Sequence, residues 1–390
     1  MDSRAHRAWI DVDLDALVRN AVVVQRRSAK PVMPMVKADA YGLGALAVCG
    51  ALESLEPWGY GVATVAEGVE LRGAGIARPI VIFGSILPEE FGQARRNRLT
   101  PTFGHAGPIR DWVEGGGGPW HLAIDTGMHR AGIEWWRIEE ILAVVATSPP
   151  EGAFTHLHSA DTSWDSVRVQ QERFRDAVAR LPVRPSLLHV ENSPGAERQA
   201  PSSWDLVRPG VFLYGVGGGE GSHVAPEPVA HFRARVVELH EVRAGETVSY
   251  GGTWVAEGDR KVATVAAGYA DGYRRLFSSR GEVLLNGRRA PVVGRVTMDM
   301  TMVDVTDVAC EVGDVATLIG RAGDDHLDIN EIGRAVDLLP YELLVGLKLR
   351  APRLYHGGGA PPRSQNTAAQ AVHRNPNPAA PIEIPPPDLP

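Results

Sequence analysis

Cysteine is scarce in this chain of 390 residues. Only Cys49 and Cys310 occur, and neither belongs to a CxxC pair or lies near a histidine at metal-ligand spacing. A disulfide framework and a structural zinc site are therefore not expected, and a reducing cytoplasm is the expected setting. The length predicts roughly two or three domains, with cores large enough to need no covalent staples.

Runs of basic residues and long apolar stretches are also missing. Lys and Arg total 40 against 47 Asp and Glu, for a net charge of −7, so the positive patch typical of nucleic-acid binding is not expected. The first residues, MDSRAHRAWIDVD, carry charges where a signal peptide has its apolar stretch. No window approaches the roughly 18 uninterrupted apolar residues of a membrane span. We therefore expect neither a nucleic-acid partner nor a membrane.

Glycine and proline, by contrast, are frequent, with 43 and 29 residues. Part of this proline lies in the last segment, residues 357–390, which contains few large apolar residues. Such a composition cannot offset the entropy cost of ordering the chain. We expect a disordered Pro-rich tail, which is either a solvated appendage or a docking segment that uses its PPP stretch as a polyproline II helix.

Short apolar runs alternate with stretches of helical periodicity over residues 13–232. The helical stretches, such as 66–76 and 165–181, carry apolar residues at helical spacing beside charged faces. This alternation indicates a parallel sheet, and eight repeats favour an α/β fold of the TIM-like (β/α)8 barrel type. The irregular period leaves an open, doubly wound sheet as the alternative. The predicted strands are 32–37, 59–64, 79–84, 99–104, 120–125, 153–158, 187–192 and 211–215.

A second, mostly β domain is predicted over residues 233–356. Its apolar runs are separated by turns that contain Gly or Asp, which is typical of antiparallel strands. One helix, 328–336, interrupts them, with Asp328 as the expected N-cap. The N-terminal residues 1–12 contain a strand-like segment outside the eight repeats, and we expect it to pack on the β domain.

Candidate functional residues lie where the barrel strands end. In a (β/α)8 barrel, chemistry gathers at the C-terminal ends of the strands, and phosphate sites favour the loops after the seventh and eighth. Lys37 ends the first predicted strand, where partial burial would lower its pKa and make it a nucleophile or general base. The alternative is a lysine that snorkels from a strand end. Asn192 and Ser193 end the seventh strand and Arg208 precedes the eighth, so these groups could hold a phosphate.

Several motifs together carry a family resemblance over residues 7–356. In chain order they are MVKADAYGLG, AIDTGMHRAGI, THLHSAD, ENSPGA, DLVRPGVFLYG, VSYGGTW, GYADGY, GRVTMDMTMVDVT and RAPRLY. With this ordered set the sequence resembles the alanine racemases. The resemblance implies a (β/α)8 barrel followed by a β domain, a pyridoxal 5'-phosphate cofactor, a small amino-acid substrate and a homodimer with composite active sites.

The resemblance also implies roles for individual residues. Lys37 would carry the cofactor and act as one acid/base group, and Tyr250 of the partner subunit would act as the other. Racemisation needs both because a proton leaves one face of the substrate carbon and returns on the opposite face. Arg130 and Met298 would lie near the substrate carboxylate and Tyr250. Cofactor contacts are implied for Tyr41, His156, Asn192, Ser193, Arg208, Gly210 and Val211.

Four positions depart from the family pattern. Leu349 replaces a tyrosine that touches the phosphate and narrows the entrance, and Ala123 replaces a frequently carbamylated lysine that orients Arg130. Leu43 and Thr297 replace a common histidine and a common cysteine. Glu191 and His129 are candidates for holding Arg130 instead.

These departures leave the substrate open. A racemase for serine or a larger amino acid is the first alternative to alanine. A decarboxylase of the same architecture and a non-catalytic pyridoxal-phosphate protein are more remote alternatives.

Overall fold

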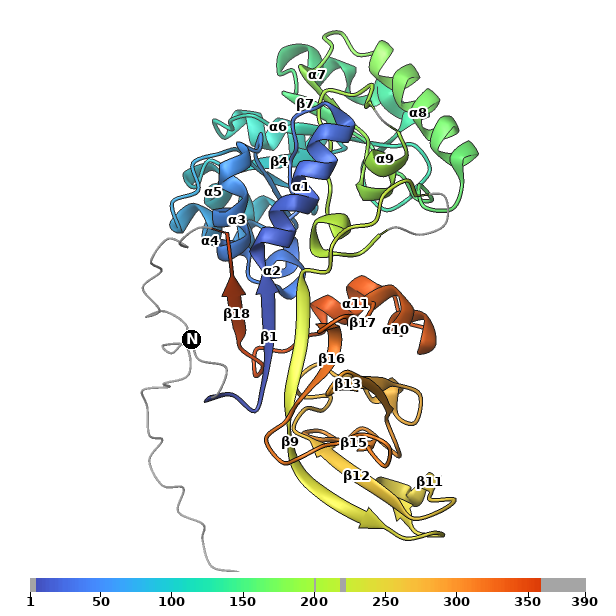
Figure 1. Cartoon of the computed structure of the whole chain (residues 1–390). Coiled ribbons are helices and arrows are strands. Elements are labelled where there is room, and N and C mark those ends of the chain that lie inside the picture. Colours follow the sequence, from blue (N-terminus) through green and yellow to red (C-terminus); the bar gives the residue numbers. More distant parts are fainter. Residues whose placement is uncertain (1–4, 200, 218–221, 359–390) are drawn as a thin grey trace, which may run out of the picture.

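The computed structural model describes residues 5–199, 201–217 and 222–358. Figure 1 shows two parts, a compact body of helices and parallel strands and, below it, a long twisted sheet. Nearly all of the tail predicted from residue 357 onward lies outside the described residues. No helix within the described ranges is long and apolar enough to cross a membrane.

The compact body is a parallel barrel. Its hydrogen-bonded strands follow one another in the order β2, β3, β4, β5, β7 and β8, and the short β6 adds to β5. Parallel bridges from Val32 to Val207 and from Met35 to Gly61 close the ring. Counted with these two bridged segments, the described residues form eight parallel staves, meaning strands or extended segments that lie side by side around the barrel. The predicted fold class is therefore confirmed. The bounds are β2 (Tyr60–Val62), β3 (Ile80–Ile82), β4 (Thr100–Phe103), β5 (His121–Asp125), β6 (Ile133–Glu134), β7 (Gly152–Phe154) and β8 (Leu187–His189).

The predicted eighth strand at 211–215 is wrong. Val211–Tyr214 forms the 3-10 helix η4, and the eighth stave is the segment through Val207, whose N–H donates to Pro31 O at 3.1 Å. Pro209 has no N–H for a sheet, although its carbonyl still accepts the Met35 N–H at 2.9 Å. The N–H groups of Gly210 and Phe212 donate to Ser193 Oγ instead of a strand, so the stave ends before the apolar run begins. That run is buried as a turn, and apolar composition alone does not distinguish a buried turn from a buried strand.

Local signals set the barrel helices. Asp13 caps α1, where its side chain accepts the Ala16 N–H, and Ser163 caps α8 in the same way. Thr64 and Glu67 form a capping box at the start of α4. The bounds are α1 (Leu14–Ser28), α2 (Lys37–Gly42), α3 (Ala45–Leu52), η2 (Glu53–Leu55), α4 (Val65–Gly73), α5 (Pro88–Arg96), α6 (Ala106–Glu114), η3 (Trp135–Ile141), α7 (Leu142–Thr147), α8 (Trp164–Ala179) and α9 (Ser193–Arg198).

The long sheet is organised by β9 (Ala230–Val242), the yellow strand that runs its length in Figure 1. Its strand order is β14, β13, β16, β9, β1 and β18, while β12 pairs with β9 and β15, and β17 pairs with β16. The strands β10 and β11 form a separate two-stranded sheet. Asp328 caps α10 by accepting two backbone N–H groups, as predicted. The bounds are β10 (Thr247–Val248), η5 (Tyr250–Gly252), β11 (Trp254–Val255), β12 (Arg260–Val265), η6 (Arg275–Phe277), β13 (Glu282–Leu285), β14 (Arg288–Pro291), β15 (Thr301–Asp304), β16 (Val315–Ala322), β17 (Asp325–Leu327), α10 (Ile329–Ala335) and α11 (Pro340–Val345).

The two ends of the described chain lie side by side in this sheet. β1 (Ala8–Asp13) pairs antiparallel with β9 and parallel with β18 (Arg353–His356). One apolar core cluster continues from the barrel into the sheet. The expected domain boundary between residues 232 and 233 falls inside β9, and the division of the chain into domains stays a prediction.

Candidate active site

A cavity of about 570 Å³ opens at the C-terminal ends of the barrel strands. Most of the residues predicted from the sequence meet there, and two, Tyr250 and Met298, do not line it. Predicted residues that line the cavity are Lys37, Tyr41, Arg130, His156, Asn192, Ser193, Arg208, Gly210 and Val211.

Lys37 precedes an unusual backbone turn. The four residues Ala38–Tyr41 have φ between 51° and 56°, so they form a turn of left-handed helix although none of them is glycine. Each such residue costs about 1 kcal/mol or more, and the turn persists only because its surroundings hold it. Asp39 Oδ1 accepts the Ala45 N–H at 2.7 Å, and Arg353 Nε donates to Gly42 O at 2.9 Å.

The surroundings of the Lys37 amine favour its neutral form. Burial lowers the pKa of Lys37, and the positive charges of Arg130 and Arg208 lower it further, while the carboxylate of Glu67 acts in the opposite direction. A lysine that loses its proton more easily is a better nucleophile and a better base near neutral pH.

Arg208 is a buried cation on the cavity wall, with 3 % of its surface exposed. Its guanidinium lies over the rings of Phe83 and Phe154, at 5.5 and 5.3 Å from their centroids. It donates to His189 O at 2.6 Å and to Thr155 O at 2.9 Å, so its position is fixed by backbone acceptors. Burial lowers the pKa of Arg208 to about 9, which leaves it charged at neutral pH.

A hydrogen-bonded chain continues from Arg208 into the barrel. Arg208 reaches His189 Nδ1 at 3.0 Å, and His189 Nε2 lies 2.9 Å from His121 Nδ1. Burial and the charge of Arg208 lower the pKa of His189, so its ring is neutral. Because arginine only donates, Nδ1 accepts and Nε2 carries the proton that His121 Nδ1 accepts.

Polar groups at the start of α9 and η4 form a small cradle. Ser193 Oγ accepts the N–H groups of Gly210 at 2.9 Å and Phe212 at 3.3 Å, which leaves its own proton free to donate. A Cβ at Gly210 would lie 2.5 Å from Tyr41 Oη, so only glycine leaves this space open. Burial raises the pKa of Tyr41 to about 12, and the phenol stays a donor. Hydroxyl donors at helix starts suit a phosphate.

His156 presents a neutral ring to the cavity, because burial and the nearby guanidinium groups lower its pKa to about 3. Gln170 of α8 holds this loop. Its Nε2 donates to His156 O and to Thr126 Oγ1, both at 3.0 Å, and its Oε1 accepts the His158 N–H at 3.1 Å. The sequence reasoning missed Gln170, since nothing in a helical pattern marks a buried glutamine that turns inward.

Neither candidate partner of Arg130 is placed to hold it. His129 Nδ1 pairs with Asp125 Oδ2 at 3.2 Å, and Glu191 is fully buried beside Ser202 rather than lining the cavity. Within the described ranges, the Arg130 guanidinium has neither a hydrogen bond nor an ion pair.

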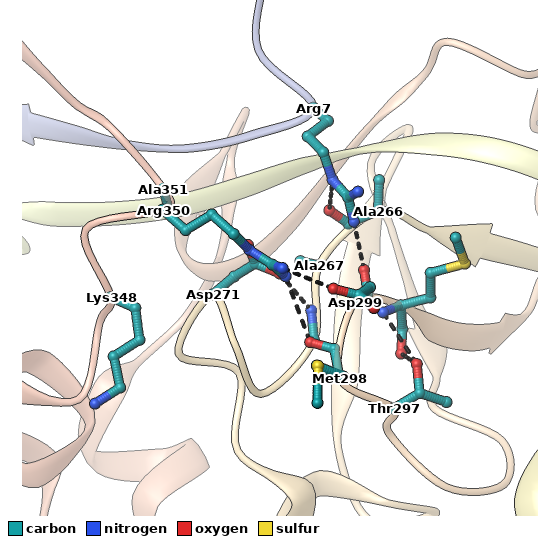
Figure 2. Close-up of polar contacts among 12 residues, drawn as sticks. Arg7, Ala266, Ala267, Asp271, Thr297, Met298, Asp299, Lys348, Arg350 and Ala351 are labelled. Carbon is teal, nitrogen blue, oxygen red and sulfur yellow. Dashed lines mark hydrogen bonds and ion pairs between the residues drawn. The ribbon is translucent and has the colours of Figure 1, made fainter. Parts of the chain in front are cut away.

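Tyr250 and Met298 lie between strands in the C-terminal part of the chain, on its surface. Tyr250 begins η5 and is 72 % exposed, Met298 is 52 % exposed, and Leu349 is 84 % exposed. Figure 2 shows how Arg350, next to Leu349, fastens the part of this surface around Met298: it forms a bidentate pair with Asp271, both distances being 2.7 Å, and reaches Asp299 Oδ1 at 2.6 Å. Met298 and Leu349 are therefore exposed on a surface whose backbone is held by ion pairs.

Two family models match consecutive parts of the chain, the alanine racemase N-terminal domain over residues 12–217 and the C-terminal domain over residues 229–355. The chain belongs to the alanine racemase family. An alanine racemase of Symbiobacterium thermophilum is 38 % identical over 369 residues, which cover 90 % of this chain and 97 % of the relative. One of Syntrophobacter fumaroxidans is 34 % identical over 367 residues, covering 90 % and 98 %.

Solved structures of the family share the fold. The alanine racemase of Bacillus anthracis with bound L-Ala-P has a TM-score of 0.84 at 28 % identity and covers 91 % of this chain and 96 % of its own. The enzyme of Bartonella henselae, which has covalently bound pyridoxal phosphate, has a TM-score of 0.83 at 27 % identity and covers 90 % and 100 %.

The cavity of this chain fits the same cofactor. Lys37 offers a partly buried amine for covalent attachment, the Ser193–Gly210 cradle offers donors and space for a phosphate, and Arg208 offers a fixed cation on the cavity wall. No group of three or more His, Cys, Asp or Glu side chains able to hold a metal ion occurs in the described ranges.

Proposed function

We propose that this chain interconverts L- and D-alanine with pyridoxal phosphate, using Lys37 and Tyr250 of the partner subunit as the two acid/base groups. The observation that carries the proposal is the convergence of a partly buried amine of lowered pKa, a fixed guanidinium and a cradle of hydroxyl donors in one cavity. The family relationship supports the reaction class.

Different residues of the cavity would contact different parts of the cofactor. Tyr41, Ser193, Gly210 and Val211 would hold its phosphate, with Asn192 shaping the start of α9 through its bond to the Gly195 N–H. His156 would pack on its ring, and Arg208 would meet its pyridine nitrogen. When bound, pyridoxal phosphate supplies an electron sink that acidifies the Cα–H of the substrate.

Lys37 and Tyr250 would move the proton. Lys37, whose pKa is lowered, would take or return it on one face of the Cα atom, and the phenol of Tyr250 would do so on the other. Arg208 would donate a hydrogen bond without giving up a proton, which keeps the pyridine nitrogen unprotonated and favours proton exchange over transamination.

We infer that the second acid/base group comes from another subunit. Tyr250 is 72 % exposed and absent from the cavity of its own chain, and Met298 and Leu349 are exposed as well. These features support a homodimer in which each chain lends this surface to the cavity of its partner. The reducing cytoplasm expected from the two isolated cysteines stays a prediction.

The test is exchange of the Cα proton in D2O, with wild type and Tyr250→Phe. Wild type should incorporate deuterium from both enantiomers, while the variant should keep the visible absorption of bound cofactor and lose exchange from one enantiomer. Unchanged exchange from both enantiomers would refute the two-base assignment. Borohydride should fix the cofactor on Lys37, and release of carbon dioxide would point to a decarboxylase instead.

A broader substrate range is the second candidate. Ala123 lines the cavity with a small side chain, and the Arg130 guanidinium has neither a hydrogen bond nor an ion pair within the described ranges. The small side chain leaves room for a larger amino acid, and no contact within the described ranges fixes how the guanidinium meets a substrate. Comparing kcat/KM for alanine, serine and bulkier amino acids decides between the two, because equal or better turnover of a bulkier one would remove alanine as the assignment.

A further inference from the structure

A side chain outside the cavity fastens the peptide that follows Lys37. The Ala38 N–H donates to Glu67 Oε1 at 2.7 Å, while the N–H groups of Ala63 and Thr64 donate to Glu67 Oε2 at 2.7 and 3.2 Å. Ala63 and Thr64 directly follow β2. One carboxylate therefore joins the residue after Lys37 to the end of a barrel strand, and both of its oxygens are needed.

The fastening matters because the turn is strained. Four consecutive non-glycine residues in the left-handed region persist only where neighbours hold them. Asp39 braces the turn from within, Arg353 holds its last carbonyl, and Glu67 holds its first N–H. Of these three contacts, the one made by Glu67 is adjacent in sequence to Lys37, so it has the most direct control over where the amine points.

Glu67 also acts on the charge of the Lys37 amine. The charged and titratable groups that face this amine are Arg130 from the loop after β5, Arg208 from the segment before η4, His156 from the segment after β7, and Glu67 from α4. Burial and the two guanidinium groups lower the pKa of Lys37, whereas Glu67 raises it.

We propose that Glu67 is a positioning residue for Lys37, which fixes the left-handed turn that carries the amine and supplies the negative charge that balances Arg130 and Arg208. It lies outside the cavity lining and acts through Lys37. The inference rests on the proposed function, in which Lys37 is the reacting amine. A glutamine in its place has no negative charge. Its NH2 group would also face a backbone N–H on one side, so that two donors would oppose each other.

The chain offers a matched control in Glu90. Glu67 and Glu90 both occupy the third position of a helix, in α4 and α5, and both accept the N–H of the residue before the helix. Glu90 has no contact with the Lys37 turn. The substitution Glu90→Gln therefore reports the loss of helix capping alone, whereas Glu67→Gln reports capping together with the effect on Lys37.

The first experiment measures the amine directly in the full-length, cofactor-free chain. Acetic anhydride labels neutral amines, so labelling of Lys37 followed by mass spectrometry from neutral to alkaline pH gives its midpoint. Loss of the negative charge should move the midpoint of Glu67→Gln downward by roughly half a unit to one unit, with Glu90→Gln at the wild-type value. A midpoint of Glu67→Gln equal to that of wild type would overturn the electrostatic part of the proposal.

A second variant, Glu67→Asp, separates position from charge. Aspartate keeps the negative charge but is one methylene shorter, so it cannot reach both Ala38 and the end of β2. Its labelling midpoint should stay near that of wild type, while kcat for alanine racemisation should fall about tenfold or more with little change in KM. A kcat equal to that of wild type would overturn the positioning part. If wild type itself did not racemise alanine, the proposed function would fail, and the labelling result would still decide the role of Glu67 toward Lys37.

Discussion

Glu191 makes the stability of this protein depend on pH in a predictable way. Its side chain is fully buried, and neither carboxyl oxygen has a hydrogen-bond partner of good geometry among the described residues. Burial raises the pKa of Glu191 from 4.5 to about 7, against weaker opposing effects of Ser202 and Arg208. The folded protein therefore holds a proton there that the unfolded chain has already released near pH 5.

The sign and size follow from linkage. A carboxyl whose folded pKa is raised destabilises the fold progressively as pH rises from 4.5 to about 7; the cost is constant above about pH 7 and absent below pH 4.5. The pKa difference between the folded and the unfolded state lowers the unfolding free energy by about 3 kcal/mol above pH 7. Roughly 2.5 kcal/mol of this loss develops between pH 5 and pH 8. The substitution Glu191→Gln removes the ionisation, so its advantage over wild type should grow by this amount.

Thermal unfolding checks the prediction. With saturating cofactor at both pH values, because bound ligand also raises Tm, the Tm difference between Glu191→Gln and wild type should widen by roughly 3 to 5 °C from pH 5 to pH 8. Glu70→Gln, an exposed position on α4, is the control and should show a constant difference. A Tm difference for Glu191→Gln that is the same at both pH values would refute the reasoning.

Three further substitutions test the site. Gly210→Ala places a Cβ 2.5 Å from Tyr41 Oη, so cofactor affinity should fall about tenfold or more in an absorbance titration; unchanged affinity would contradict the cradle. Gln170→Leu removes the three hydrogen bonds that Gln170 makes to the His158 N–H, Thr126 Oγ1 and His156 O. It should lower the unfolding free energy by about 2 kcal/mol, whereas an unchanged Tm would show that water replaces the glutamine. Arg353→Lys keeps the charge but loses most contacts to four carbonyls, including that of Gly42; Tm should fall by several degrees, and a wild-type Tm would mean that the turn needs no such clamp.

The sequence predicts much of the barrel because the signals that set its strands and helices are local. Lys37 and Ser193 could be placed at one end of the barrel from strand order alone, and the structure brings both to the cavity. The stave through Val207 was missed because the buried turn Val211–Tyr214 is more apolar than the stave itself. The glutamate of α4 was missed because a capping-box residue carries no sign that it also binds the next loop.

Contacts between distant segments were beyond prediction for a different reason. Arg350 meets Asp271 across 79 residues, and Arg353 meets Gly42 across 311. Such pairs depend on how the sheet and the barrel are set against each other, and a single sequence contains no local periodicity that reports it. The left-handed turn belongs to the same class, since Ala38–Tyr41 has a composition that favours an ordinary right-handed helix.

The pairing of β1 has a consequence for how the protein is made. This first strand is completed by the last, since His356 Nε2 meets Asp11 Oδ1 across 345 residues, and Ile10 lies between Phe232 and Arg353. A ribosome releases β1 long before it makes either partner, so the strand waits unpaired with its apolar face uncovered. A barrel expressed alone would keep that orphan strand permanently, and it should aggregate. Barrel and sheet should therefore fold as one unit, and neither should be exchangeable as a separate module by cutting the chain before β9.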